Sequence, residues 1–106
     1  MYSLSLLSNS QGISLQGVVS VADAEQCAAE GSMLLAQLSA QQPWLCDLTE
    51  LAEASSVVVA VLMSWQRVAG AKSTQLSLIA PPPRLRSILE ASNLLSVFAL
   101  ESKETT

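Results

Sequence analysis

Apolar and polar residues alternate in two short stretches near the start of the chain. Residues 2–7 (YSLSLL) place Tyr and Leu on one face and serines on the other, which is the period of a half-buried β-strand. Residues 9–12 (NSQG) are typical of a turn, and the alternation resumes over residues 13–17 (ISLQG). The pattern predicts a β-hairpin joined by a short loop.

Three later stretches repeat apolar residues at the spacing of an amphipathic helix. The first begins at Ser20, which can cap a helix, with Asp23 in the first turn where the helix dipole favours negative charge. We expect this helix to run to about Ala40. The second predicted helix spans about residues 56–71. The third follows the prolines at 81–83, since proline suits the first turn of a helix.

The remaining apolar segments predict the other strands. Residues 44–48 (WLCDL) and 74–80 (TQLSLIA) are short and aliphatic, and residues 94–100 can form a last strand or helix. The predicted order is therefore β-β-α-β-α-β-α, with an optional final β. This order is typical of an α/β fold, here a mixed β-sheet with its helices packed mainly on one face. We expect one domain over residues 1–100 and a polar tail at 101–106 that frays.

The composition points to a protein partner. Half of the 106 residues are hydrophobic and 13% are charged, so a domain of this size cannot bury all of its apolar surface. The net charge is −4, and all five basic residues lie at or after Arg67, behind six acidic residues. Because duplex binding draws on clustered Lys and Arg, we expect no nucleic-acid partner.

Two cysteines and no histidine limit the chemistry. Cys27 and Cys46 are far apart in apolar surroundings, which predicts buried free thiols in a reducing cytoplasm and no metal site. There is no Ser–His pair and no phosphate-binding loop of the GxxxxGK(S/T) type. We therefore expect a binding protein without catalytic residues or a cofactor. The chain has no signal-peptide pattern and no apolar run of the ~20 residues that a membrane span needs, so we expect a cytoplasmic protein.

One stretch combines two hydroxyls with a long apolar run. Residues 53–65 read EASSVVVAVLMSW, and Ser55 and Ser56 stand where the chain enters the second predicted helix. We expect one of the two serines to cap this helix by accepting a backbone N–H, which stabilises a helix by about 1 kcal/mol.

The same helix predicts a core face and a contact surface beside it. Val59 and Met63 lie off the core face, on the side of Ser56, and we expect them to be partly exposed. With Ser55 and Ser56 they form a small, mostly apolar docking patch, although a single exposed apolar residue is also normal on a monomer. The predicted core face consists of Val58, Val61, Leu62, Trp65 and Ala69.

Ser56 is also a candidate phosphosite. A phosphate there would sit at a helix N-terminus, where the backbone N–H groups and the dipole favour negative charge. It would also place about two negative charges in the docking patch. A partner fitted to a neutral hydroxyl would then be repelled.

The order of elements and the stretch from residue 47 onward resemble the STAS domain family (sulfate transporter and anti-sigma factor antagonist). In that family a strand ends in Asp-Leu-Ser/Thr, as Asp47-Leu48-Thr49 do here, and a loop then leads to Asp-Ser-Ser/Ala-Gly-Leu at a helix start. Ser55 stands at the place of the family's Asp, and Ser56 at that of its phosphorylatable Ser or Thr. Val58 stands where Gly is usual.

The neutral Ser-Ser-Val opening and the aliphatic helix with its Trp are most similar to the MlaB branch of the STAS family. This resemblance implies a non-catalytic cytoplasmic protein that binds and supports the ATPase subunit of a phospholipid-transporting ABC complex, which maintains outer-membrane lipid asymmetry. The protein would then be peripheral to an inner-membrane complex, at the inner face of that membrane. The resemblance places Ser56 at the contact with the ATPase.

Two other functions stay open. The STAS family includes anti-sigma factor antagonists, in which a kinase-type anti-sigma factor phosphorylates the serine and the complex breaks. Here the family's acidic residue before Ser56 and its glycine after it are absent. The third alternative is a domain that binds a small ligand or lipid in an apolar cavity. The oligomeric state stays open as well.

Overall fold

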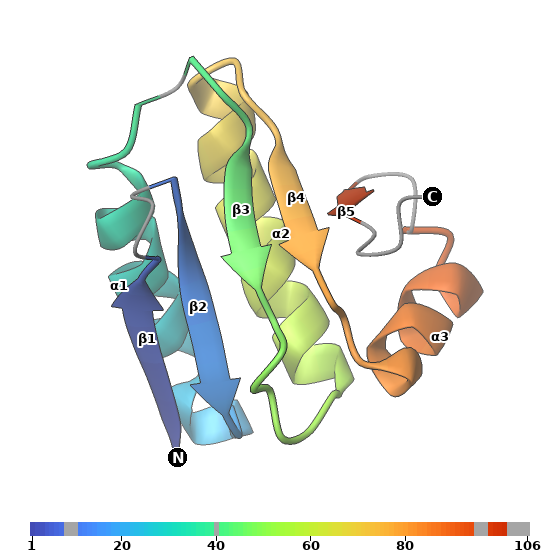
Figure 1. Cartoon of the computed structure of the whole chain (residues 1–106). Coiled ribbons are helices and arrows are strands. Elements are labelled where there is room, and N and C mark those ends of the chain that lie inside the picture. The colour runs from blue at the N-terminus through green and yellow to red at the C-terminus, as the bar shows by residue number, and fades with distance from the viewer. Residues whose placement is uncertain (8–10, 40, 95–97, 102–106) are drawn as a thin grey trace.

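The computed structural model describes residues 1–7, 11–39, 41–94 and 98–101. Its elements follow one another in the predicted order, with a strand as the last of them (Figure 1). The strands are β1 (Tyr2–Leu6), β2 (Gly12–Gly17), β3 (Trp44–Asp47), β4 (Leu76–Ile79) and β5 (Ala99–Glu101), and the helices are the short η1 (Val21–Asp23), α1 (Ala24–Leu35), α2 (Ser56–Ala71) and α3 (Pro83–Ala91).

The five strands form one sheet in the order β1-β2-β3-β4-β5. β1 and β2 form the predicted antiparallel hairpin, and the later neighbours are parallel, which makes the sheet mixed. Parallel neighbours need a crossover connection, and α1, α2 and α3 supply one each. α1 and α2 lie side by side behind one face of the sheet, and α3 packs against α2 on its other flank (Figure 1). The predicted α/β fold is confirmed.

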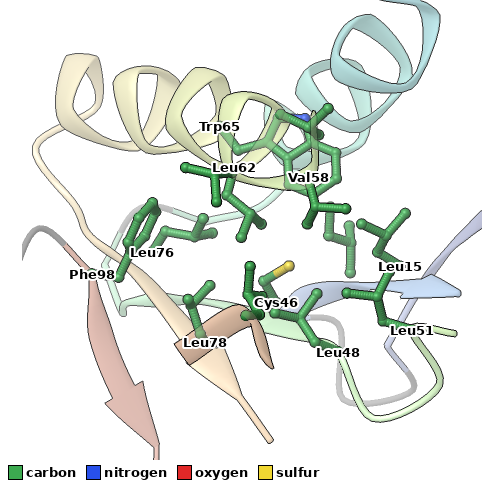
Figure 2. Close-up of a cluster of buried hydrophobic side chains, with 14 of the residues drawn as sticks. Leu15, Cys46, Leu48, Leu51, Val58, Leu62, Trp65, Leu76, Leu78 and Phe98 are labelled. Carbon is green, nitrogen blue, oxygen red and sulfur yellow. The ribbon is translucent and has the colours of Figure 1, made fainter. Parts of the chain in front are cut away.

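Side chains that point from the sheet towards α2 form the hydrophobic core. Successive strand residues point to opposite faces, so each central strand sends every second side chain towards the helices. The predicted core face of α2 is buried in full. Figure 2 shows the resulting cluster, with Leu15, Cys46, Leu76 and Leu78 from the strands and Val58, Leu62 and Trp65 from α2.

Both tryptophans are buried, and each donates its indole N–H to a carbonyl oxygen. Trp65 Nε1 lies 3.0 Å from the carbonyl oxygen of Ala28 on α1, and Trp44 Nε1 lies 3.0 Å from that of Ser39. A Cβ on Gly31 of α1 would come within 2.2 Å of the Trp65 ring. Glycine at this position therefore allows α1 and α2 to pack closely around the indole.

Helix α1 begins as predicted and ends early. Ser20 caps the first turn, which is the short helix η1, and its Oγ accepts the N–H of Asp23 at 3.2 Å. α1 ends at Leu35 instead of near residue 40, because the amides of residues 37 and 38 bond to carbonyl oxygens only three residues back, as in a turn.

The last predicted segment does contain a strand. β5 pairs with β4 in parallel and ends at Glu101, one residue beyond the predicted domain boundary. Residues 95–97 and the remainder of the predicted tail, 102–106, lie outside the described residues.

Candidate functional site

Helix α2 begins at the two serines, and Ser55 is its cap. Ser55 has an extended backbone, and its Oγ accepts a hydrogen bond from the N–H of Val57 at 3.2 Å. Its carbonyl oxygen accepts the first helical bonds, from the amides of Val58 and Val59. The Ser55 side chain therefore satisfies one of the amides that a helix start leaves without a partner. The predicted serine cap is confirmed and belongs to Ser55.

Ser56 differs from its neighbour in both exposure and bonding. It is exposed, and its hydroxyl makes no hydrogen bond to any residue that the structure describes. Ala60, Met63 and Arg67 follow at i+4, i+7 and i+11, so they lie on the same outward side of α2. Ala60 and Arg67 are exposed and Met63 is half-buried. A neutral hydroxyl at the helix tip is thus followed by small and apolar side chains before the first charge.

Val59 does not belong to this surface. It is only 8% exposed and lies in the core cluster, so the prediction that it is partly exposed is wrong. The physical reason is that α2 packs against α1 on one flank and against α3 on the other, which buries a wider arc than one helical face. Met63 is half-buried as predicted. Ala60 was missed, although its i+4 spacing from Ser56 was a signal for it.

The loop between β3 and α2 is held by hydrogen bonds at both ends. Asp47 Oδ1 accepts the N–H of Thr49 at 2.9 Å and its hydroxyl at 2.6 Å, which closes a turn directly after the strand. Gly17, at the end of β2, donates its N–H to the carbonyl oxygen of Glu50 and accepts the N–H of Ala52. Gly17 has a φ of 86°, a backbone conformation that residues with a side chain rarely adopt. These bonds fix the segment that delivers the chain to Ser55.

A groove of about 580 Å³ lies beside the helix tip, between this loop and the start of α3. α3 begins at Pro83, so the N-termini of α2 and α3 both border the groove. Glu53 lines it from the loop and Arg84 from α3, and both side chains are exposed. The tip therefore combines an exposed hydroxyl, apolar side chains and one charge of each sign, which are groups that suit a contact with another protein. The part contributed by α3 comes from a distant segment of the chain.

The potential nucleophiles lie away from the tip. Cys27 and Cys46 are free and buried, as predicted. Burial raises the pKa of both thiols, that of Cys27 to about 11. A neutral thiol is a poor nucleophile and a poor metal ligand. Among the described residues, no three Cys, Asp or Glu side chains gather where they could hold a metal ion.

The mixed sheet with its helices mainly on one face is the fold of a STAS domain, and Ser56 lies exposed at the start of the helix that follows the central strand. The chain belongs to the family described as the MlaB STAS domain, whose family model matches residues 3–99.

Solved structures agree with this assignment at the level of the fold. The anti-sigma factor antagonist SpoIIAA in its unphosphorylated form superposes with a TM-score of 0.71 at 18% identity, covering 98% of this chain and 90% of that one. SpoIIAA of Bacillus in the phosphorylated form gives 0.66 at 19% identity, covering 98% and 94%. An anti-sigma-factor antagonist (STAS) domain protein of Planctomyces limnophilus gives 0.63 at 16% identity, covering 97% and 92%. STAS domains are protein-interaction modules, which agrees with a protein partner for this chain.

No curated protein sequence matches the chain. In the described ranges, no helix combines the length and the apolar character that crossing a membrane requires.

Proposed function

We propose that this protein is a non-catalytic STAS subunit that binds and supports the ATPase subunit of a phospholipid-transporting ABC complex. In this role it works in the cytoplasm, at the inner face of the inner membrane, and reaches the membrane only through its partner. The match to the MlaB STAS family supports the proposal, since the resemblance implies this role.

The observation that carries the proposal is that the two serines at the start of α2 have different roles. The side chain of Ser55 forms the cap, whereas the hydroxyl of Ser56, at the exposed start of α2, has no hydrogen-bond partner among the described residues. Ala60 and Met63 extend the same side with small and apolar groups. A free donor and acceptor beside an apolar strip can form a central hydrogen bond within a contact that excludes water.

The proposed mechanism is stoichiometric. The α2 tip docks on the ATPase subunit, and because it binds the assembled form preferentially, it shifts the subunit towards that form. The protein itself contributes no reacting group. A negative charge at Ser56 weakens the contact, because the partner surface fits a neutral hydroxyl and a buried charge without a counter-charge is costly.

The test compares Ser56→Glu with Ser56→Ala in co-purification with the ATPase subunit. We expect Ser56→Ala to lower the affinity about five- to tenfold through the lost hydrogen bond, and Ser56→Glu to lower it about a hundredfold or more. Ser92→Glu is the matched control, since Ser92 is exposed at the end of α3 that lies away from the groove, and its hydroxyl makes no hydrogen bond to a described residue. Equal recovery of the ATPase by the glutamate variant and by the control would contradict the proposal.

An anti-sigma factor antagonist is the second candidate. It is favoured by the exposed position of Ser56 at a helix N-terminus, which a kinase can reach, and by the fold shared with the unphosphorylated and phosphorylated forms of SpoIIAA. Incubation with ATP and a kinase-type anti-sigma factor should then place a phosphate on Ser56, which mass spectrometry of the intact chain and its peptides would detect. The Ser56→Ala variant should stay unmodified.

A further inference from the structure

The outer edge of β1 presents main-chain groups that no described strand pairs. The hydrogen bonds from Val18 N to Met1 O and from Leu7 N to Gly12 O show that Met1 and Leu7 face β2. In an antiparallel pair the bonded residues alternate, so residues 3 and 5 face β2 as well. The N–H and C=O groups of the even residues of this strand, Tyr2, Leu4 and Leu6, therefore point away from the sheet.

Within the residues that the structure describes, this edge lacks the features that usually protect an edge strand. Natural proteins place Lys, Pro or a bulge there, or cover the edge with another segment. β1 contains no charged residue and no proline, and its register with β2 is regular over all five residues. Leu6 is 46% exposed, which is high for a leucine at the end of a strand.

A groove of about 630 Å³, lined by both apolar and polar side chains, runs alongside the edge, between β1 and α1. Tyr2 and Leu4 form its strand side, and Met33 and Leu34 form part of its helix side. Met33 is 69% exposed, although it lies on a helix that packs against the core. A strand added to β1 would lie over this groove and cover these side chains.

We propose that a second copy of this chain occupies the edge, with the two β1 strands paired antiparallel around Leu4. In this register Leu4 faces Leu4 of the second copy, and Tyr2 faces Leu6. The outward N–H and C=O groups of Tyr2, Leu4 and Leu6 then bond to those of Leu6, Leu4 and Tyr2 of the second copy. Every outward main-chain group of the two strands therefore has a partner. The two sheets become one continuous sheet, and each copy covers Leu6 and Met33 of the other.

The distribution of charge fits a second copy. The acidic residues of the groove, Asp23 and Glu30, lie at its Tyr2 end, and the Tyr2 hydroxyl donates to Glu30 Oε1 at 2.7 Å. In the proposed register the two Tyr2 residues are four positions apart along the pair, about 14 Å. The acidic ends of the two grooves therefore lie at opposite ends of the paired segment and do not face each other directly. Uncharged groups face one another at the centre.

The proposed pairing uses a different part of the molecule from the α2 tip. β1 lies at one end of the strand order, and α3, which borders the tip, packs beyond β4 (Figure 1). A dimer through β1 therefore leaves both Ser56 residues open, and the two contacts are independent of each other.

The experiment measures the mass of the purified chain by light scattering over a wide range of concentration. We expect the mass to rise from 11.2 kDa towards twice that value. Leu6→Glu should weaken the association about tenfold or more, because it sets a charge against Tyr2 and Glu30 of the second copy. Val21→Glu is the matched control, since it adds the same charge at another exposed aliphatic residue, 80% exposed, outside the groove. It should associate like the parent chain.

Amide hydrogen exchange gives a second readout at the level of residues. The amides of Leu4 and Leu6 should exchange fast in the dilute protein and become protected as its concentration rises, while the amide of Ser5 is protected throughout by β2. A chain that stays monomeric at every concentration overturns the proposal, even if some other peptide binds the edge. Association that is unchanged by Leu6→Glu, in a variant with an unaltered circular dichroism spectrum, overturns it as well.

Discussion

On the side of α2 that faces α1, Trp65 lies against Gly31 with no space for one methyl group. On its outward side lie Ser56 and Ala60, which are exposed, and Met63, which is half-buried. Both sides are largely apolar, so hydrophobicity does not distinguish them. The difference lies in the polar groups, because the indole N–H of Trp65 already has a carbonyl partner and the hydroxyl of Ser56 has none among the described residues.

The side of α2 that faces α1 is closed, because it is packed within the fold, and the outward side is open, because it remains available for binding. A buried polar group costs stability unless it is bonded, so the closed side must be satisfied within the chain. An exposed hydroxyl can bond to water, so it costs the free protein no stability. The hydroxyl of Ser56 on the open side can therefore form a hydrogen bond with another protein.

The largest effect is expected where the closed side leaves the least space. Gly31→Ala places a methyl group against the Trp65 ring and should lower the free energy of unfolding by about 1–3 kcal/mol, although alanine is the better helix former. Denaturant unfolding measures the change. Gly70→Ala is the control, since a Cβ at this exposed residue of α2 meets nothing within 4 Å, and it should be neutral or stabilise by up to about 1 kcal/mol. Equal effects of the two variants would show that the contact is loose.

Substitutions of the two serines at the start of α2 test whether one is structural and the other is available for binding. Ser55→Ala removes the cap and should lower the free energy of unfolding by about 1 kcal/mol. Ser56→Ala removes an exposed hydroxyl without a described partner and should change it by less than about 0.5 kcal/mol. Thermal and denaturant unfolding of both variants, with partner binding measured in parallel, checks the assignment. If Ser56→Ala proved the more destabilising, Ser56 would be the structural residue of the pair.

The smallest effect is expected at the surface bond between β1 and α1. Tyr2 is the sole tyrosine of the chain, and its hydrogen bond to Glu30 raises its pKa from 10.0 to about 12. The bond favours the neutral phenol in the folded state, so its contribution is present below pH 10.0 and is lost as the pH rises through about 12. Tyrosinate absorbance should therefore titrate near pH 12, with tryptophan fluorescence reporting that the chain stays folded.

Glu30→Gln is the matched change for this bond, because it keeps the shape of the side chain and removes its charge. It should move the midpoint of the Tyr2 titration down towards the ordinary value. The hydrogen bonds from Tyr2 and Gln26 also lower the pKa of Glu30, so the same contact is lost at the acidic end as the pH falls through that lowered pKa. An unchanged tyrosinate midpoint in Glu30→Gln would mean that the bond is absent in solution.

The sequence alone predicted the features that depend on local periodicity. The core face of α2 and a serine cap at its start follow from spacings within a single element, and the hairpin and the alternation of strands and helices follow from the order of such elements along the chain. These features hold because backbone geometry sets the side-chain period of a strand at two and of a helix at 3.6, whatever lies nearby.

The tertiary structure decided what each element meets. Val59 is buried because α2 is packed on both flanks, by α1 and by α3, and the groove at the tip exists because the start of α3 lies beside the loop that leads to α2. The early end of α1, the contact of Gly31 with Trp65 and the open edge of β1 are of the same kind. All of them depend on which segments become neighbours in space, and a periodicity read along one segment carries no information about the others.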